Sequence, residues 1–265
     1  MIKYTMARPI IFCLDNTNGF FALFFIMCNA YIASKKMGSP FYITQAGWSY
    51  AYKEGWHDYF VTLRAPPLFP KLTDPIRVGC DLARFYAPDF PLAEYVTSIR
   101  ELFILNTELQ QRADAIISRM SPNYIAIFVR RGDKLIEEAG YISFVDILAR
   151  IPHTEQTVFF IQTDDYGVVE EAKRALPTSR IESTVPPTKR GSFHTRHRSK
   201  QQIKEETEEM LVGLSVCLRA PACWTDSTSN VGRFLKLASP RVRVYPEDFA
   251  VDLSYVMCPA WSIKR

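Results

Sequence analysis

Short apolar segments alternate regularly with helical segments in the second half of this chain, and this alternation restricts the folds that it can adopt. The apolar segments have the length and composition of buried β-strands, and apolar residues recur at helical spacing in the segments between them. Such alternation predicts a parallel, doubly wound sheet with helices on its faces. The expected strands are residues 124–129, 157–161, 222–225 and 242–245, and the expected helices are 142–150, 167–175, 203–216 and 231–238.

The first half opens with the same pattern. An apolar strand at residues 9–14 is followed by a polar turn at 15–19, a helix at 20–36 and a strand at 41–44. This order predicts a βαβ unit. Aromatic residues and prolines obscure the pattern after it, and helical periodicity returns at residues 92–119. The Ser121-Pro122-Asn123 turn separates the halves, so we expect an α/β chain with one domain at 1–120 and another at 121–265.

Composition narrows the classes of function. The formal net charge of +4 is too small to indicate a nucleic-acid partner. The apolar stretch at residues 19–33 is shorter than the roughly 20 residues that span a bilayer, and no basic segment or cleavage site makes it a signal peptide. We therefore expect a soluble, cytoplasmic protein without a membrane span. The cysteines lack paired CxxC spacing, which favours reduced thiols over a zinc site.

Polar clusters follow several of these strands or lie in the loops beside them, at residues 15–19, 130–134, 163–165 and 225–230. Ligands of doubly wound sheets bind beyond the carboxyl ends of the strands. The four clusters are therefore expected to contribute to one ligand site.

The cluster after the strand at residues 124–129 favours a diphosphate ligand. Guanidinium groups bind phosphate oxygens bidentately, and the adjacent Arg130 and Arg131 point in different directions, so one can face a ligand while the other braces the site. Asp133 can hold an arginine in place. A solvated surface turn is the plainer alternative. An RGD adhesion motif is a third, and it would require secretion and disulfides.

The other polar segments each have more than one interpretation. Residues 225–230 precede a helix, so their hydroxyls and backbone N–H groups are able to bind an anion or simply cap the helix. Asp164 and Asp165 are able to hold a metal ion, contact a nucleobase or ribose, or cap a helix. Glu138 is either a general base or part of a solvated helix face. The basic segment at residues 189–200 is either a solvated loop or a loop that closes over a phosphate-bearing ligand.

Four ordered segments resemble a known family. IAIFVRRGDK resembles the HxRRxDK segment of the α1,6-fucosyltransferases, which include the core N-glycan and nodulation enzymes. IQTDDYGVVEEAKRALP, SFHTRHRS and TSNVGRFLKLA resemble the segments that follow it in that family. The opening NGFFALFFIMCNAYIASKK is more loosely similar to the start of related fucosyltransferases, a superfamily that includes the protein O-fucosyltransferases.

The resemblance implies a type-B glycosyltransferase fold, with two Rossmann-like halves around a cleft and a reduced N-terminal half. It also implies inverting chemistry without a metal, and a nucleotide-sugar donor held by the C-terminal half. The proposed base of the family falls at Glu138, and the N-terminal loop facing the cleft at Asn16, Asn18 and Gly19. The donor-binding positions that the resemblance implies are Arg130, Arg131, Asp133, Lys134, Asp164, Asp165, His194, Arg196, Thr228, Ser229 and Asn230.

Within that set the resemblance assigns distinct roles. Arg130 and Arg131 match the phosphate arginines, which also makes them catalytic, and Asp164 with Asp165 matches the acidic position that reads the nucleobase. Thr228 and Ser229 match the hydroxyl pair near the phosphates. His194 and Arg196 match the loop that closes on the donor.

The chain departs from the family in two places, the residue at position 128 and the short N-terminal half, which implies a reduced acceptor domain. Phe128 replaces the histidine that helps to bind guanine, so a UDP-sugar such as UDP-xylose is the alternative to GDP-fucose. The membrane anchor of the animal members has no counterpart here, which fits a bacterial or viral origin.

The expected function is glycosyl transfer to a hydroxyl of an oligosaccharide or glycoprotein glycan. A degenerate module that binds nucleotide or glycan without turnover is the remote alternative. Acceptor contacts are expected from aromatic residues of the first half, with core packing as the alternative role of Trp48, Trp56 and Tyr50.

Overall fold

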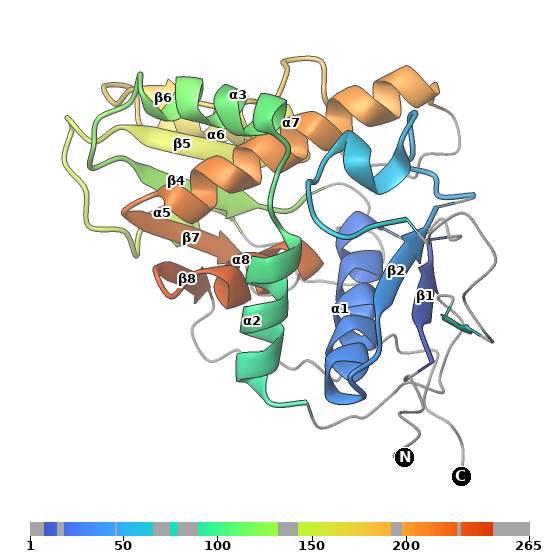
Figure 1. The fold of residues 1–265 in the computed structure, drawn as a ribbon. Coiled ribbons are helices and arrows are strands. Elements are labelled where there is room, and N and C mark those ends of the chain that lie inside the picture. Colours follow the sequence, from blue (N-terminus) through green and yellow to red (C-terminus); the bar gives the residue numbers. More distant parts are fainter. Residues whose placement is uncertain are drawn as a thin grey trace, which may run out of the picture. The chain divides into compact units, whose positions relative to one another are not determined.

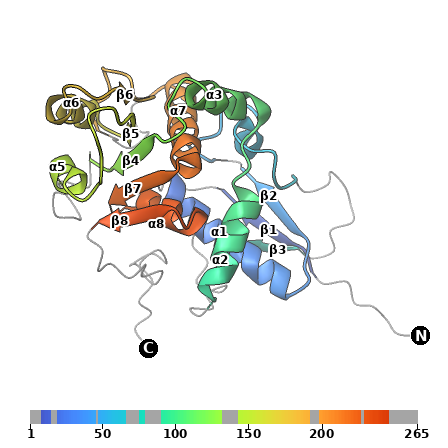
Figure 2. The same cartoon turned by 90° about the vertical axis from the view of Figure 1, so that its left-hand side faces the viewer.

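The chain divides between Ile104 and Leu105 into two compact units, each with its own parallel sheet (Figures 1 and 2). The computed structural model describes residues 8–14, 19–45, 47–65, 75–78, 90–131, 143–191, 198–226 and 229–245. The predicted α/β class with parallel sheets is confirmed. In the part of the chain described, no helix combines the length and apolar character needed to cross a membrane.

The first unit contains a three-stranded sheet in the order β2-β1-β3. Its elements are β1 (Ile10–Cys13), α1 (Phe20–Lys36), β2 (Phe41–Thr44), the 3-10 helix η1 (Gly55–Asp58), β3 (Ile76–Val78) and α2 (Leu92–Leu102). β1 pairs in parallel with both neighbours, so the predicted βαβ unit is confirmed. The helix between its strands is apolar on nearly all sides because it is largely buried.

Aromatic side chains fill the core of the first unit. The rings of Trp56 and Phe60 stack with centroids 4.2 Å apart, and Trp48 packs against Tyr59 edge to face. Trp48 and Trp56 are 5% and 1% exposed. The hydroxyl of Tyr50 accepts a hydrogen bond from the backbone N–H of Phe20 at the start of α1. The two tryptophans are therefore core residues, and they do not present a face to a sugar.

The second unit contains a five-stranded parallel sheet in the order β6-β5-β4-β7-β8. Its strands are β4 (Ile125–Val129), β5 (Phe159–Thr163), β6 (Ile181–Glu182), β7 (Ala222–Asp226) and β8 (Val242–Tyr245). Its helices are α3 (Thr107–Ile117), α5 (Phe144–Leu148), α6 (Tyr166–Ala175), α7 (Lys200–Arg219) and α8 (Asn230–Ala238).

The segment at residues 92–119 is helical, as its periodicity predicts. It forms two helices, because Phe103 leaves the helical region and the side chain of Asn106 accepts a hydrogen bond from the N–H of Leu109 to start α3. α3 packs against α7 and belongs to the second unit, although the expected first domain extends to residue 120.

The observed strands differ from the predicted ones at β5, whose limits are shifted, and at β6, which was not predicted. β5 begins two residues after the expected start and extends to Thr163, so that Asp164 follows the strand directly. The two-residue strand β6 has too short an apolar pattern to be predicted.

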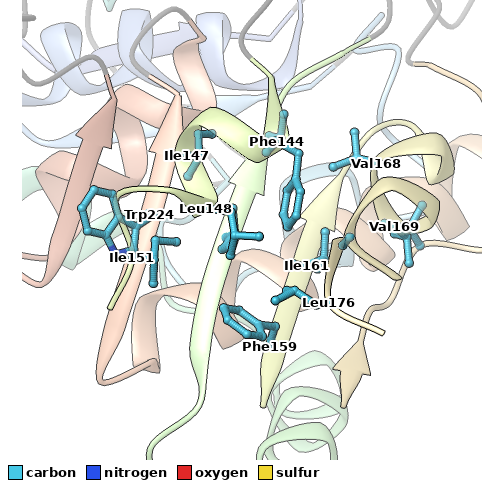
Figure 3. Packing of buried hydrophobic residues seen from close by; sticks show 14 residues of the cluster. Phe144, Ile147, Leu148, Ile151, Phe159, Ile161, Val168, Val169, Leu176 and Trp224 are labelled. Carbon is cyan, nitrogen blue, oxygen red and sulfur yellow. The ribbon is translucent and has the colours of Figure 1, made fainter. Parts of the chain in front are cut away.

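Alternate residues of the strands pack on opposite faces of the second sheet. Ile127 and Val129 of β4 face a cluster built with α5 and α6, in which Phe144, Phe159 and Ile161 are fully buried (Figure 3). α7 and α8 contact β4, β5 and β7 from the other side. Both faces of the strands are therefore covered, which explains their continuous apolar runs.

Candidate functional site

The site lies where the strand order of the second sheet reverses. From β4 the chain proceeds through β5 and β6 on one side, then returns to β7 and β8 on the other. The reversal between β4 and β7 is the topological switch point at which doubly wound sheets bind ligands. Arg130 directly follows β4 and Asp226 ends β7, so charged residues occupy the carboxyl end of both strands.

Arg130 is held from both neighbouring strands. Its backbone N–H donates to Oδ2 of Asp226 over 3.1 Å. Its Nη1 lies 2.9 Å from Oδ2 of Asp164, which follows β5. The Arg130 side chain is 18% exposed. It therefore keeps access to solvent although its backbone and guanidinium are both bound by carboxylates.

Arg131 is the more deeply buried arginine of the pair, at 4% exposure. Its backbone N–H donates to Oδ1 of Asp164 over 2.6 Å. Its Nη2 lies 3.5 Å from Oε2 of Glu171 on α6. Arg130 is therefore the arginine nearer to solvent, and Arg131 is the one held inside the unit.

The adjacent carboxylates of Asp164 and Asp165 bind different partners. Asp164 binds both arginines, as described above. Oδ1 of Asp165 accepts a hydrogen bond from the N–H of Gly167 over 2.8 Å and caps α6. The helix-cap interpretation of Asp165 is thus confirmed. Among the residues described, no group of histidine, cysteine, aspartate and glutamate side chains is arranged to hold a metal ion.

The N-terminus of α8 adjoins the arginines. Oγ of Ser229 accepts a hydrogen bond from the N–H of Gly232 over 3.0 Å, which confirms the capping role expected of this segment. The N–H of Ser229 donates to Oδ1 of Asp226 over 3.0 Å. Oδ1 of Asn230 accepts from Nη1 of Arg233 over 3.1 Å. Asp226 therefore contacts both the start of α8 and the start of the arginine turn.

Sequence reasoning included Asp226 in a polar cluster but did not select it as a site residue. The signal that identifies it is positional, because it is the last residue of a buried strand next to the switch point. Two of its partners are the backbone N–H groups of Arg130 and Ser229, which no side-chain pattern shows.

Gly232 allows α8 to approach β7 closely. A methyl group at this position would lie 2.1 Å from the backbone oxygen of Asp226 and 3.0 Å from Oγ1 of Thr225. Because backbone cannot rotate away, Gly232→Ala is expected to lower the free energy of unfolding by about 1–3 kcal/mol. Urea denaturation measures this loss.

Gly19→Ala is the matched control, because open space surrounds Gly19. It is expected to cost at most about 1 kcal/mol through its effect on capping α1. A Gly232→Ala protein as stable as the unmodified chain would contradict the tight contact.

Ion pairs flank the segment that carries His194 and Arg196. Nζ of Lys189 lies 2.9 Å from Oε2 of Glu209, and Arg198 pairs with Glu206. Both acids lie on α7, three residues apart and hence on one side of the helix. Burial raises the pKa of Glu209, and the charge of Lys189 opposes that shift. His194 and Arg196 themselves lie outside the described residues.

Several expected site residues are not covered by the description of the structure. They are Asn16, Asn18, Asp133, Lys134, Glu138, His194, Arg196 and Thr228. Their expected roles stay predictions. Gly19 is described, and it forms the exposed N-cap of α1 in the first unit.

Phe128 is a core residue of the second sheet. It lies in register with Gln162 of β5 and Thr225 of β7, and all three are at most 3% exposed. A methyl group built on Gly213 of α7 would lie 2.0 Å from Oε1 of Gln162, which places this row on the face that α7 and α8 cover. Phe128 offers no hydrogen bond to a nucleobase.

Comparison with known proteins identifies the fold. No protein-family model matches the chain, and no curated protein matches its sequence. The fucosyltransferase NodZ from Bradyrhizobium matches with a TM-score of 0.59 at 14% identity over 91% of this chain and 98% of NodZ. POFUT1 in complex with GDP matches with a TM-score of 0.53 at 13% identity over 89% of this chain and 97% of POFUT1.

A plant protein shows the same likeness. FUT1 of Arabidopsis thaliana, also in complex with GDP, matches with a TM-score of 0.54 at 8% identity over 90% of this chain and 70% of FUT1. At these identities the comparisons establish the architecture, and they confirm the expected resemblance at that level. The chain has the fold of the fucosyltransferases NodZ, POFUT1 and FUT1.

Proposed function

We propose that this protein is an inverting, metal-independent glycosyltransferase that moves one sugar from a nucleotide-diphosphate donor to a hydroxyl of a glycan. The observation that carries the proposal is the arginine pair at the switch point of the second sheet, next to the N-terminus of α8. Guanidinium groups and a helix N-terminus both favour anionic oxygens. The solved structures of this fold include NodZ soaked with GDP-fucose and POFUT1 with GDP.

The proposed reaction makes one bond and breaks one bond at the anomeric carbon of the donor sugar. Glu138 takes the proton from the acceptor hydroxyl, whose oxygen attacks the anomeric carbon from the face opposite the diphosphate. The bond between the sugar and the diphosphate oxygen breaks, and the nucleoside diphosphate leaves with the electron pair. Inversion at that carbon follows from the direction of attack.

Stabilisation of the leaving group is the main contribution of the site. Negative charge grows on the diphosphate as the bond to the sugar breaks, and preorganised donors aimed at it lower the barrier. Arg130 is the candidate for this contact, since its side chain retains exposure while Arg131 is buried. Asp164 holds Arg130 in place before the donor arrives.

GDP-fucose is the donor that the family resemblance supports. A UDP-sugar such as UDP-xylose is the second candidate, and the buried, apolar Phe128 favours it because the guanine-binding histidine is replaced. The acceptor is proposed to be an oligosaccharide or a glycoprotein glycan. A module that binds nucleotide without turnover would bind the diphosphate through the same residues and would not catalyse transfer.

A thermal-shift panel tests the proposal directly. GDP, UDP, GDP-fucose, UDP-xylose and UDP-glucose are each added at high excess with a chelator present. A ligand at a hundred times its Kd stabilises the folded state by about 2.7 kcal/mol, which raises the Tm of a chain of this size by roughly 5–10 °C. We expect such a shift with the guanine compounds, and a shift with the uridine compounds alone would assign the donor to the UDP class.

Two outcomes would contradict the proposal, and a third measurement separates an enzyme from a binding module. The absence of a shift with every nucleotide would contradict the proposed function, and a shift that needs manganese would contradict its metal independence. Release of free sugar from the bound donor, or transfer to a glycan, distinguishes an enzyme from a binding module.

A further inference from the structure

We infer that Asp226 is a positioning residue for the donor diphosphate, which holds the arginine turn and the N-terminus of α8 at a fixed separation. The inference rests on the proposed function, because it assigns to Asp226 the geometry of the diphosphate site. Asp226 itself is 1% exposed and acts through the groups that it holds.

The two oxygens of one carboxylate make the connection. Oδ2 accepts a hydrogen bond from the N–H of Arg130, and Oδ1 accepts one from the N–H of Ser229. Arg130 follows β4 and Ser229 caps α8. The side chain of Asp226 therefore joins the turn after β4 to the N-terminus of α8. Pairing of Asp226 with Tyr245 on β8 fixes the backbone from which this carboxylate extends.

The same arginine is fixed a second time from the opposite side. Asp164, which follows β5, binds the Arg130 guanidinium and the N–H of Arg131. Asp226 thus sets where the backbone of the turn lies, and Asp164 sets where the guanidinium points. A diphosphate that contacts both Arg130 and the start of α8 requires the backbone of the turn and the guanidinium to be held in these positions.

Charge alone does not explain an aspartate at this place. A buried negative charge next to an anion site repels the anion, so an electrostatic effect of Asp226 would weaken diphosphate binding. A carboxylate does, however, supply two acceptors in one rigid group. Asparagine has the same shape but only one acceptor oxygen, and its amide N–H groups would face one of the two backbone donors.

These two interpretations predict opposite results for Asp226→Asn. If only charge matters, loss of the negative charge strengthens the binding of a nucleoside diphosphate. If position matters, loss of the bridge weakens it. The sign of the change therefore separates a positioning role from a bystander charge.

The experiment is calorimetric titration of the full chain with GDP and with UDP. For Asp226→Asn we expect the Kd of the nucleotide that binds to rise at least about tenfold, a change of about 1.4 kcal/mol. Glu208→Gln is the matched control, since Glu208 is a buried carboxylate on α7 that pairs with Arg112 and Lys204. It is expected to lower the Tm and leave the Kd unchanged.

A double-mutant cycle shows whether Asp226 acts through Arg130. In an Arg130→Ala background the side chain carried by the positioned turn is absent, while Asp226 still holds the start of α8. Asp226→Asn is therefore expected to raise the Kd by a smaller factor than it does in the unmodified chain. If Asp226→Asn does not fold, Asp226→Ser serves in both comparisons, because serine fits the space and lacks the pair of oxygens.

The outcomes also separate this inference from the proposed function. An unmodified protein that binds neither GDP nor UDP would overturn both. An unmodified protein that binds one of them, with Asp226→Asn or Asp226→Ser binding it equally or more tightly, would overturn the positioning role alone. A full effect of Asp226→Asn in the Arg130→Ala background would overturn the part of the positioning role that acts through Arg130.

Discussion

Arg130→Ala is expected to lower kcat/KM for glycosyl transfer by roughly 10²–10³-fold, the usual effect of removing one preorganised donor to a developing charge. The reason is that its guanidinium is held by Asp164 and its side chain stays 18% exposed. Asp226 joins the backbone of Arg130 to the start of α8. Initial rates at saturating and limiting donor measure the change. An enzyme with unchanged rates would contradict the assignment of Arg130 to the leaving group.

Two further variants make this result specific. Arg112→Ala removes an arginine of similar type, which pairs with the buried carboxylate of Glu208 across α3 and α7. It is expected to retain transfer. Arg130→Lys keeps the charge but not the planar fork, so it is expected to recover only part of the activity.

Arg131→Ala is expected to abolish transfer, with a larger loss of stability than Arg130→Ala. Arg131 is 4% exposed, and its guanidinium lies beside Glu171 of α6. Its removal leaves space in a buried region and releases the brace behind Arg130. Measurement of Tm beside kcat separates the two effects.

Glu138→Gln is expected to lower kcat by about 10²–10⁴-fold, the range for loss of a general base, while the donor still binds. Glutamine has the size of glutamate but cannot accept the proton of the acceptor hydroxyl. The groups proposed to hold the diphosphate, Arg130 and the start of α8, remain. Calorimetric titration with the donor nucleotide and turnover rates at saturating donor give the two quantities.

Glu137→Gln is the control for this substitution, because it removes an equal charge from the neighbouring position. It is expected to leave kcat within a few-fold of the unmodified value. If Glu138→Gln retains full turnover, or if Glu137→Gln loses it instead, the base must be reassigned.

Much of the architecture follows from local sequence patterns. The limits of α1 and β2 agree with the prediction to the residue. Their signals are local, because an apolar run forms the helix, Gly38-Ser39-Pro40 ends it and a short segment of β-forming residues follows. The alternation of strands with helices predicted the parallel sheets. Features with weaker local signals were not predicted. They are the two-residue strand β6 and the end of α2 at Phe103, which separates it from α3.

The sequence by itself also selected Arg130 and Arg131, because an adjacent pair of arginines after a buried strand is visible in one dimension. Only the tertiary structure distinguished them, by burying Arg131 against Glu171 and leaving Arg130 accessible beside Asp164. Likewise, only the strand order brought Asp226 beside Arg130, 96 residues earlier in the chain. Contacts of this kind depend on which strands become neighbours, and sequence periodicity describes each strand alone.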